Sequence, residues 1–177
     1  MTDPVAPPLF RCVLGDGFAR LPAEVRALHA GPGHWQGEAE VERGRGLLAR
    51  LCARLTRLPP AGGHPVRVEI RCDADGERWV RRYGRAHAMP SRLWLGQGRL
   101  RERLGPVVLE YALAADAACL QWRVSAARCF GCPLPARWFA GVVARESSAD
   151  GRYRFDVRAE LPGVGLLVHY RGWLAVP

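Results

Sequence analysis

Cys129 and Cys132 are the two side chains whose type and spacing most resemble a chemical site. Two thiols separated by two residues can form a redox-active dithiol or supply half of a zinc site. A thioredoxin-type site needs a helix that starts at the first cysteine, but Pro133 and Pro135 follow the pair and no β-α-β pattern surrounds it. The sequence therefore favours two loop cysteines with reduced thiols, and a redox or metal role remains the alternative.

The histidines and serines form no hydrolytic or metal-binding motif. No histidine lies in an H-x-x-x-H or H-E-x-x-H pair. A zinc site around the cysteine pair would need Cys119 with His87 or His169, which only the fold could bring together. Ser147 and Ser148 lack a G-x-S-x-G context, and no glycine-rich loop leads from a strand into a helix. We therefore expect neither a metal nor a cofactor.

Carboxylates and arginines supply the remaining candidate chemistry. Glu102 and Glu110 flank a Leu-Gly-Pro turn, and Glu146 lies near the end of an expected strand. If the sheet curves inward, we expect some of these carboxylates to meet Arg81 or Arg171 inside a cavity, where burial shifts their pKa values. The alternative is that they are ordinary surface carboxylates in water.

Strands joined by short turns must position these side chains. Apolar and charged residues alternate over 66–72 and 152–158, and Asp-Gly pairs at 75–76 and 150–151 predict hairpin turns. The Pro-Leu-Pro segment at 133–135 should interrupt the ladder, because proline cannot donate to it. After a first strand near 35–42, we expect strands over 65–72, 77–84, 91–96, 100–104, 106–114, 118–127, 139–147, 152–160 and 164–174.

Helical patterns are confined to the first third of the chain. Segment 9–14 reads as a short helix or an extended segment, and Pro22 begins a short helix over 22–29. The clearest pattern spans 47–58, with leucines on one face and arginines on another, and prolines 59–60 end it. We expect its leucines to pack on the sheet with the arginines in water. A basic amphipathic helix lying on an anionic membrane is the alternative.

These elements predict an α+β fold with one large curved antiparallel sheet of about nine strands, half-barrel to barrel-like, and two short N-terminal helices. Residues 1–8 should be a flexible tail and residues 9–177 a single domain. Such a sheet covers its apolar face by closing or by gripping the helices, and either solution leaves an apolar cavity. The six dispersed tryptophans would line that pocket or fill the core.

The charge is the unusual feature of the composition. All 26 basic residues are arginine, against 17 acidic residues, which gives a formal net charge of +9. A positive field attracts anionic partners, but the arginines are scattered among Asp and Glu rather than clustered, which disfavours nucleic-acid binding. The first eight residues have no apolar leader, and no apolar run is long enough to span a bilayer. We therefore expect a cytoplasmic protein whose six cysteines are reduced and mostly buried.

Ordered fragments from about Leu14 to Leu174 carry a family resemblance, although no single fragment is specific. In chain order they are PAEVRALH (22–29), WQG (35–37), RGRGLLA (43–49), LP (58–59), ERWVRRYG (77–84), Glu102, GP (105–106), GCPLP (131–135), DGRYRFDV (150–157) and YRGWL (170–174). They resemble a bacterial family, domain of unknown function 4166. That family is similar to modules fused behind NADP-binding, saccharopine-dehydrogenase-like domains. The resemblance thus implies a dehydrogenase partner.

Together these features predict a non-enzymatic, soluble module that binds a small hydrophobic or acyl-type ligand in a sheet-enclosed pocket. Arg81, Glu102, His29 and Tyr170 are the candidate polar groups at the pocket mouth, with Trp79 as a further ligand-binding residue. One alternative is an enzyme of the isomerase or cyclase type that uses Glu102 and His29 as acid and base. Another is an arginine-driven nucleic-acid binder. A second copy of the chain, covering an exposed sheet edge, is a further candidate partner.

Overall fold

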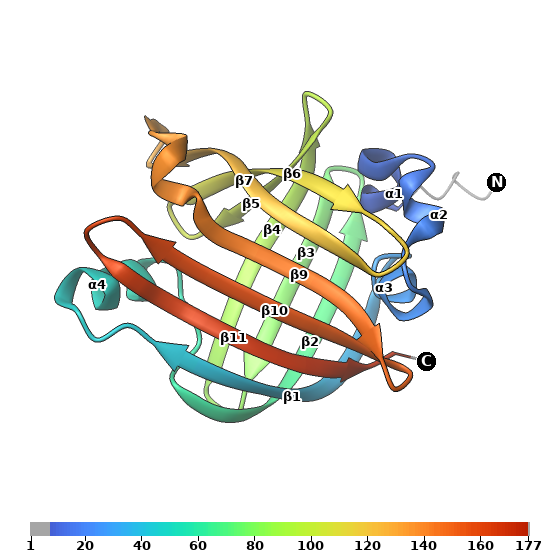
Figure 1. Cartoon of the computed structure of the whole chain (residues 1–177), viewed down its shortest axis with the longest axis horizontal. Helices are drawn as coiled ribbons and strands as arrows, with labels where there is room; N and C mark the ends of the chain where they lie inside the picture. Colours follow the sequence, from blue (N-terminus) through green and yellow to red (C-terminus); the bar gives the residue numbers. More distant parts are fainter. Residues whose placement is uncertain (1–7, 177) are drawn as a thin grey trace.

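The structure, a computed structural model that describes residues 8–176, is a closed antiparallel barrel with short helices at both ends (Figure 1). Of the flexible tail expected over 1–8, residues 1–7 lie outside the described residues, and Pro8 is the N-cap of α1. The strands are β1 (Gly33–Arg43), β2 (Gly62–Asp73), β3 (Gly76–Tyr83), β4 (His87–Gly96), β5 (Arg99–Leu104), β6 (Val107–Ala115), β7 (Cys119–Cys129), β8 (Cys132–Leu134), β9 (Gly141–Ala149), β10 (Arg152–Leu161) and β11 (Gly165–Ala175). The helices are α1 (Leu9–Leu14), α2 (Gly17–Arg20), α3 (Ala23–Leu28), α4 (Leu47–Leu55) and the 3-10 helix η1 (Ala136–Phe139).

Ten of these strands form a ring. Strands β1 to β7 pair in chain order, β7 pairs with β9, and β9, β10 and β11 follow until β11 pairs with β1. The predicted antiparallel, barrel-like sheet is confirmed, and the expected count of about nine strands is close to the ten in the ring and the one outside it. Closure leaves no open edge in the ring, and the short strand β8 outside it is the one described strand with an unpaired side.

The extra strand β8 lies where the sequence predicted a break in the ladder. It pairs only with β7, with Pro133 opposite Arg128. Proline is tolerated there because its missing N–H would face away from the sheet, on an outer edge strand. The Phe130–Gly131 pair between β7 and β8 has positive φ at both residues, as do Gln97–Gly98 and Asp150–Gly151. All three suit two-residue hairpin turns, which match the twist of the strands.

Two glycines allow β1 and β11 to approach closely enough to complete the ring. A Cβ on Gly37 would lie 1.8 Å from the backbone oxygen of Trp173. A Cβ on Gly172 would lie 2.1 Å from the backbone oxygen of Glu38, so the two strands are in contact from both sides. A side chain at either position would clash with the backbone of the opposite strand and force the first and last strands apart.

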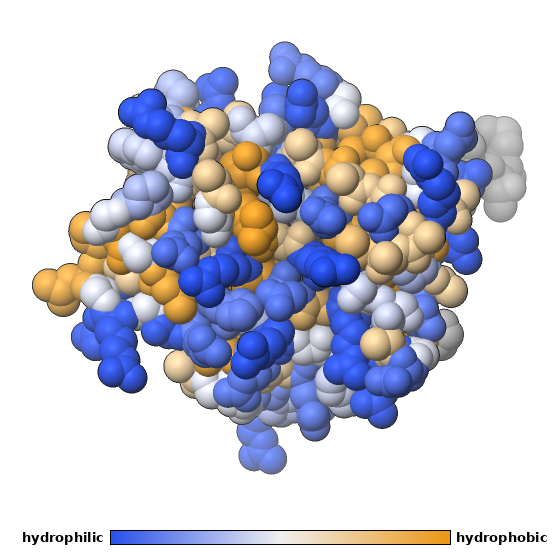
Figure 2. Space-filling view, viewed as in Figure 1, coloured by the Kyte–Doolittle hydropathy of each residue, from blue (hydrophilic) through white to orange (hydrophobic). Residues whose placement is uncertain are grey.

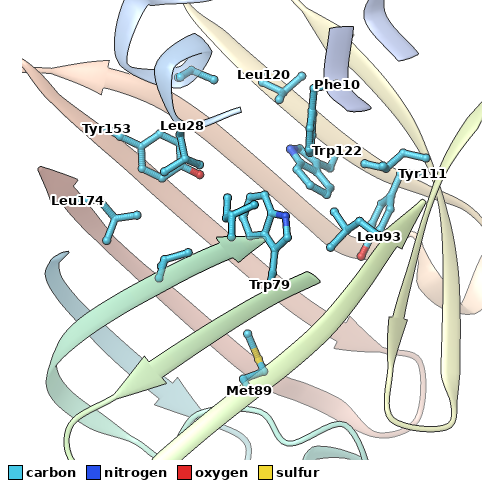
Figure 3. Packing of buried hydrophobic residues seen from close by; sticks show 14 of the residues in the cluster. Phe10, Leu28, Trp79, Met89, Leu93, Tyr111, Leu120, Trp122, Tyr153 and Leu174 are labelled. Atoms are coloured by element: carbon cyan, nitrogen blue, oxygen red, sulfur yellow. The ribbon is translucent and has the colours of Figure 1, made fainter. Parts of the chain in front are cut away.

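Helices α1, α2 and α3 close one end of the barrel, which we call the plug end (Figure 1). Phe10 and Leu28 are fully buried there, and the Phe10 ring centroid lies 5.2 Å from that of Trp122 and 6.3 Å from that of Trp79. Figure 3 shows these aromatic rings converging from α1, β3 and β7. None of the helices between residues 8 and 176 is both long and apolar enough to cross a bilayer.

Helix α4 lies at the opposite end of the barrel, which we call the α4 end (Figure 1), and it packs differently from the expectation. Helix α4 buries Ala49 and Ala53, while the leucines of its other face point outward. The helix is fixed at both ends: Arg43 donates to the carbonyl oxygens of Leu58 and Pro59, at 3.1 and 2.7 Å. Small alanines let the helix backbone lie close to the barrel rim, so the longer leucine side chains are left on the solvent side. The expectation that the leucines pack on the sheet is therefore wrong for the leucines of α4, whereas Leu58, just beyond the helix, packs against the core.

Gly37→Ala should destabilise the fold by roughly 2–4 kcal/mol, because it places a methyl group against the backbone of β11 where the ring closes. Gly46→Ala is the matched control, since a Cβ there meets only one atom, at 4.0 Å, and should change stability by about 0.5 kcal/mol or less. Urea unfolding followed by tryptophan fluorescence compares the two. Equal stabilities of the two variants would show that the glycine contact does not limit closure.

Candidate functional site

The barrel encloses a cavity of about 270 Å³ with predominantly apolar walls. It extends from Leu28 of α3, near the plug end, to Cys52 and Leu55 of α4 and Thr56 directly after that helix. The walls come from side chains that alternate inward along the strands, among them Val66, Val68, Met89, Leu104, Leu109, Val142, Ala144, Phe155, Val157, Leu167, Val168 and Leu174. The inward face of the sheet thus does not fill the interior completely.

A polar cluster crosses this apolar wall on four consecutive strands. Arg81 of β3 donates to Ser91 Oγ of β4 at 2.9 Å, and its two terminal nitrogens lie 3.4 Å from Glu102 Oε1 of β5. Tyr111 of β6 donates to Glu102 Oε2 at 3.1 Å. Each residue occupies an inward position of its strand, so the alternation that builds the barrel also brings these groups together.

Arg81 keeps its charge inside the cavity. Burial is the largest single influence on the pKa of Arg81 and lowers it, but the Glu102 carboxylate and the neighbouring tyrosines together raise the pKa above its ordinary value. The guanidinium also lies over the Trp79 ring, 4.7 Å from its centroid. The Arg81 side chain retains 13% exposure and lines the cavity, while Glu102 is almost fully covered. The cavity wall therefore presents one cation with part of its surface uncovered.

Four tyrosines surround this cation. Tyr83, Tyr111, Tyr153 and Tyr170 all line the cavity. Burial raises the pKa of Tyr83, Tyr111 and Tyr153 well above their ordinary value, and raises that of Tyr170 to about 12. Their hydroxyl groups are therefore neutral at physiological pH, and each can donate or accept a hydrogen bond.

A second polar pair lies at the plug end of the cavity. His29 Nε2 and Glu146 Oε2 are 2.5 Å apart, and the His29 side chain is completely buried. The His29 ring stacks on Phe10 with centroids 3.7 Å apart, whereas Glu146 lines the cavity. Nearby, Trp79 donates to the buried Glu77 at 2.8 Å. The His29–Glu146 contact ties the end of α3 to β9 through a buried carboxylate.

The structure brings most of the sequence-predicted ligand residues together. Arg81, Glu102, Tyr170 and Trp79 line one cavity, while His29 lies behind Glu146. Glu102 and His29 are buried in the interior rather than at a pocket mouth. A ligand-binding role of these five residues remains a prediction.

The other predicted carboxylate and arginine partners lie outside the cavity. Glu110 pairs with Arg101 at 3.0 Å, and Arg171 pairs with Glu42 at 3.6 Å. Sequence reasoning did not single out Ser91, Tyr111 or Tyr153 as site residues. The alternation of side chains along a strand could have identified them, because each lies on the same face of its strand as the inward apolar residues.

The fold does not bring the candidate zinc ligands Cys119, His87 and His169 to the Cys129–Cys132 pair. Cys129 and Cys132 face each other across a hairpin at the α4 end, whereas Cys119 begins β7 at the plug end. His169 contacts Asp156 at 2.9 Å, and His87 contacts the carbonyl oxygen of Arg57 at 2.9 Å. The candidate zinc ligands are therefore spread over the barrel.

The expectation of mostly buried thiols is wrong. Only Cys119 is buried, whereas Cys12, Cys72 and Cys132 are exposed. Partial burial, together with neighbouring carboxylates, raises the pKa of Cys72 to about 11. That thiol is therefore protonated at neutral pH and is a poor nucleophile.

Glu77→Gln should stabilise the fold at neutral pH but not in acid. Burial raises the pKa of Glu77, although the Trp79 hydrogen bond and the backbone amide of Leu9 oppose the rise. The folded protein then holds the proton more tightly than the unfolded chain, so Glu77 lowers stability as pH rises above its ordinary pKa of 4.5. Urea unfolding between about pH 4 and about pH 7 should show the variant's advantage appearing only as pH rises. An advantage independent of pH would contradict the raised pKa.

Comparison with known proteins places the chain in a family. The family model DUF4166, described as a domain of unknown function, matches residues 21–174. No curated protein matches the chain. Among solved structures, the crystal structure of Rv2717c from M. tuberculosis aligns with a TM-score of 0.44 and 11% identity, over 89% of this chain and 99% of that chain. That likeness is too weak to support a functional argument. The match to the family model extends over nearly the whole barrel, and the chain belongs to the DUF4166 family.

Proposed function

We propose that this domain binds a small hydrophobic molecule with an acyl carbonyl or carboxylate group inside the barrel. The observation that carries the proposal is a partly uncovered cation, Arg81, in the wall of a predominantly apolar cavity. Ligand sites commonly combine apolar walls with a few polar groups that fix orientation. The walls would take the hydrocarbon part, and the Arg81 cluster would take the polar group.

The geometry of the Arg81 cluster supports an oxygen-bearing ligand group. Charge-assisted N–H···O bonds are typically about 2.7–2.9 Å long, and the Arg81–Glu102 contact is longer, at 3.4 Å. Arg81 is therefore not saturated by Glu102 and can donate to a further acceptor. Tyr170 is a neutral hydroxyl on the same cavity wall, available to a second ligand oxygen.

The proposed role is retention of a ligand rather than its conversion. The resemblance to modules fused behind dehydrogenase domains supports a role beside a separately encoded enzyme, to which the bound molecule would be presented. In that role the barrel excludes water from the apolar part of the ligand, and the plug helices block exit at the opposite end.

A second candidate function rests on the His29–Glu146 pair. A carboxylate that lines the cavity and contacts a buried imidazole at 2.5 Å has the arrangement of an acid–base pair. Such a pair would suit an isomerase or cyclase acting on the enclosed molecule. Conversion of the extracted ligand by the wild-type protein, lost in Glu146→Gln with binding retained, would favour this alternative.

Native mass spectrometry tests the proposed function. Freshly purified protein should carry a discrete added mass that disappears after solvent extraction. Ala144→Trp places a large ring on the cavity wall and should remove that mass, because little volume remains for a ligand. Ala112→Trp is the matched control, since Ala112 is exposed on the outside of β6.

Each result bears on the cavity directly. Loss of the added mass in Ala144→Trp, with retention in Ala112→Trp, places the ligand inside the barrel. An added mass that survives in folded Ala144→Trp would place it elsewhere. If no mass is present, titration with decanoate provides the same comparison, and failure of the wild-type protein to bind decanoate would contradict the proposal.

A further inference from the structure

Helix α4 presents a stripe of leucines to solvent. Leu47, Leu48, Leu51 and Leu55 are exposed by 82, 58, 53 and 43%, respectively. These positions share one side of the helix, opposite the buried alanines. A surface helix of a closed domain normally turns its apolar side inward. This inverted arrangement leaves most of the apolar side of α4 facing solvent.

Other exposed apolar side chains lie at the same end of the barrel. Phe130, in the β7–β8 turn, is 77% exposed, and Trp138 of η1 is 44% exposed. Across residues 8–176, Leu95 is the one large exposed apolar residue at the plug end. Figure 2 shows apolar surface at the left edge, where Figure 1 places α4. An apolar area of this kind marks an interaction surface.

The two ends of the barrel also differ in charge. The segments that connect strands at the α4 end are 44–61, 84–86, 105–106, 130–131, 135–140 and 162–164. They contain no Asp or Glu and six exposed arginines, which are Arg45, Arg50, Arg54, Arg57, Arg85 and Arg137. The plug-end segments 8–32, 74–75, 97–98, 116–118 and 150–151 contain the carboxylates Asp16, Glu24, Asp75, Asp116 and Asp150 and the arginines Arg11, Arg20 and Arg26. The apolar stripe therefore lies within the basic end.

We propose that the α4 end docks on an anionic phospholipid surface. The outward leucines of α4 enter the boundary between headgroups and acyl chains, and the flanking arginines contact lipid phosphates. Leucines on one face with arginines beside them are the pattern of a helix that lies in a membrane interface. Trp138 adds an aromatic residue of the type enriched at that depth.

Charge favours a lipid surface over the other occupants. A symmetric dimer through α4 would bring the arginines of one copy against those of the other, with no carboxylate in the connecting segments to pair with them. The nearest strand carboxylates, Glu42 and Glu160, already pair with Arg171 and Arg158. A nucleic acid would use the arginines but leave the leucines exposed, because its binding depends mainly on phosphate contacts.

This surface lies at the end of the barrel that the cavity reaches. Cys52, Leu55 and Thr56 line the cavity, and Leu55 also belongs to the exposed stripe. A docked protein would hold this end against lipid, so that an apolar molecule could pass between bilayer and cavity with little exposure to water. The docking itself goes beyond the proposed function and does not require the cavity to be occupied.

Vesicle co-sedimentation of the full chain tests the proposal. Binding should be strong to vesicles of phosphatidylcholine with phosphatidylserine, weak to phosphatidylcholine alone, and reduced by salt. Leu47→Gln with Leu51→Gln should weaken binding by about tenfold or more, because two exposed leucines no longer enter the interface. Neither leucine lines the cavity, and Leu95→Gln at the plug end is the matched control and should bind like the wild type.

Two double variants that remove arginine charges test the electrostatic part of the proposal. Arg50→Gln with Arg54→Gln should weaken binding by roughly tenfold, whereas Arg11→Gln with Arg20→Gln at the plug end should have little effect. Absence of binding to the anionic vesicles would overturn the proposal. So would a loss caused by the arginine changes alone, which indicates a polyanion site. A dimer disrupted by the leucine changes, with vesicle binding intact, would assign the surface to a second copy.

The cavity-filled Ala144→Trp variant separates this proposal from the proposed function. It should bind vesicles like the wild-type protein, because the leucine stripe and its arginines are unchanged. Parallel loss of ligand and vesicle binding in this folded variant would contradict docking by an external surface.

Discussion

Pairing of the first strand with the last is the constraint on which the structure depends. Without the β1–β11 ladder, the remaining pairings form an open sheet with two edges, and its inward face would be exposed to water. With it, ten strands enclose an interior. A ring of about eight strands is just filled by its own side chains, so a ring of ten leaves additional space. The cavity is thus a geometric consequence of closure, and the plug helices fill only one end of it.

Closure also determines how charge is tolerated inside. Arg81, Glu102 and Glu146 occupy inward positions, where an isolated charge would be strongly disfavoured. Each has a partner across neighbouring strands or from the plug: Glu102 lies beside Arg81, and Glu146 beside His29. Buried pairs of this kind add little net stability compared with apolar side chains. Under the proposed function, contact with a ligand accounts for their presence in the wall of a cavity.

The sequence predicted the strands well because alternation and turn residues are local signals. It predicted that an inward-curving sheet would bring some carboxylates to Arg81 or Arg171, and the structure has Glu102 beside Arg81. It did not pair His29 with Glu146, which are 117 residues apart and are joined only when α3 folds over the end of the barrel. Helix α4 was located correctly, but its buried face was predicted wrongly. Periodicity shows that one face of a helix is apolar, whereas the shape of the neighbouring barrel rim decides which face is buried. At α4 the buried face is that of Ala49 and Ala53.

The most direct measurement of an accessible, oriented interior is a titration of isotope-labelled protein with decanoate, followed by amide and side-chain NMR. One saturable site is predicted, with the largest shifts at Arg81, Glu102 and Tyr170 and smaller shifts along α4, where the cavity reaches the end of the barrel. Residues on the outer face of the sheet, such as Asp156, should be unaffected. Shifts confined to the outer arginines, or shifts that rise without saturation, would contradict a ligand-accessible cavity.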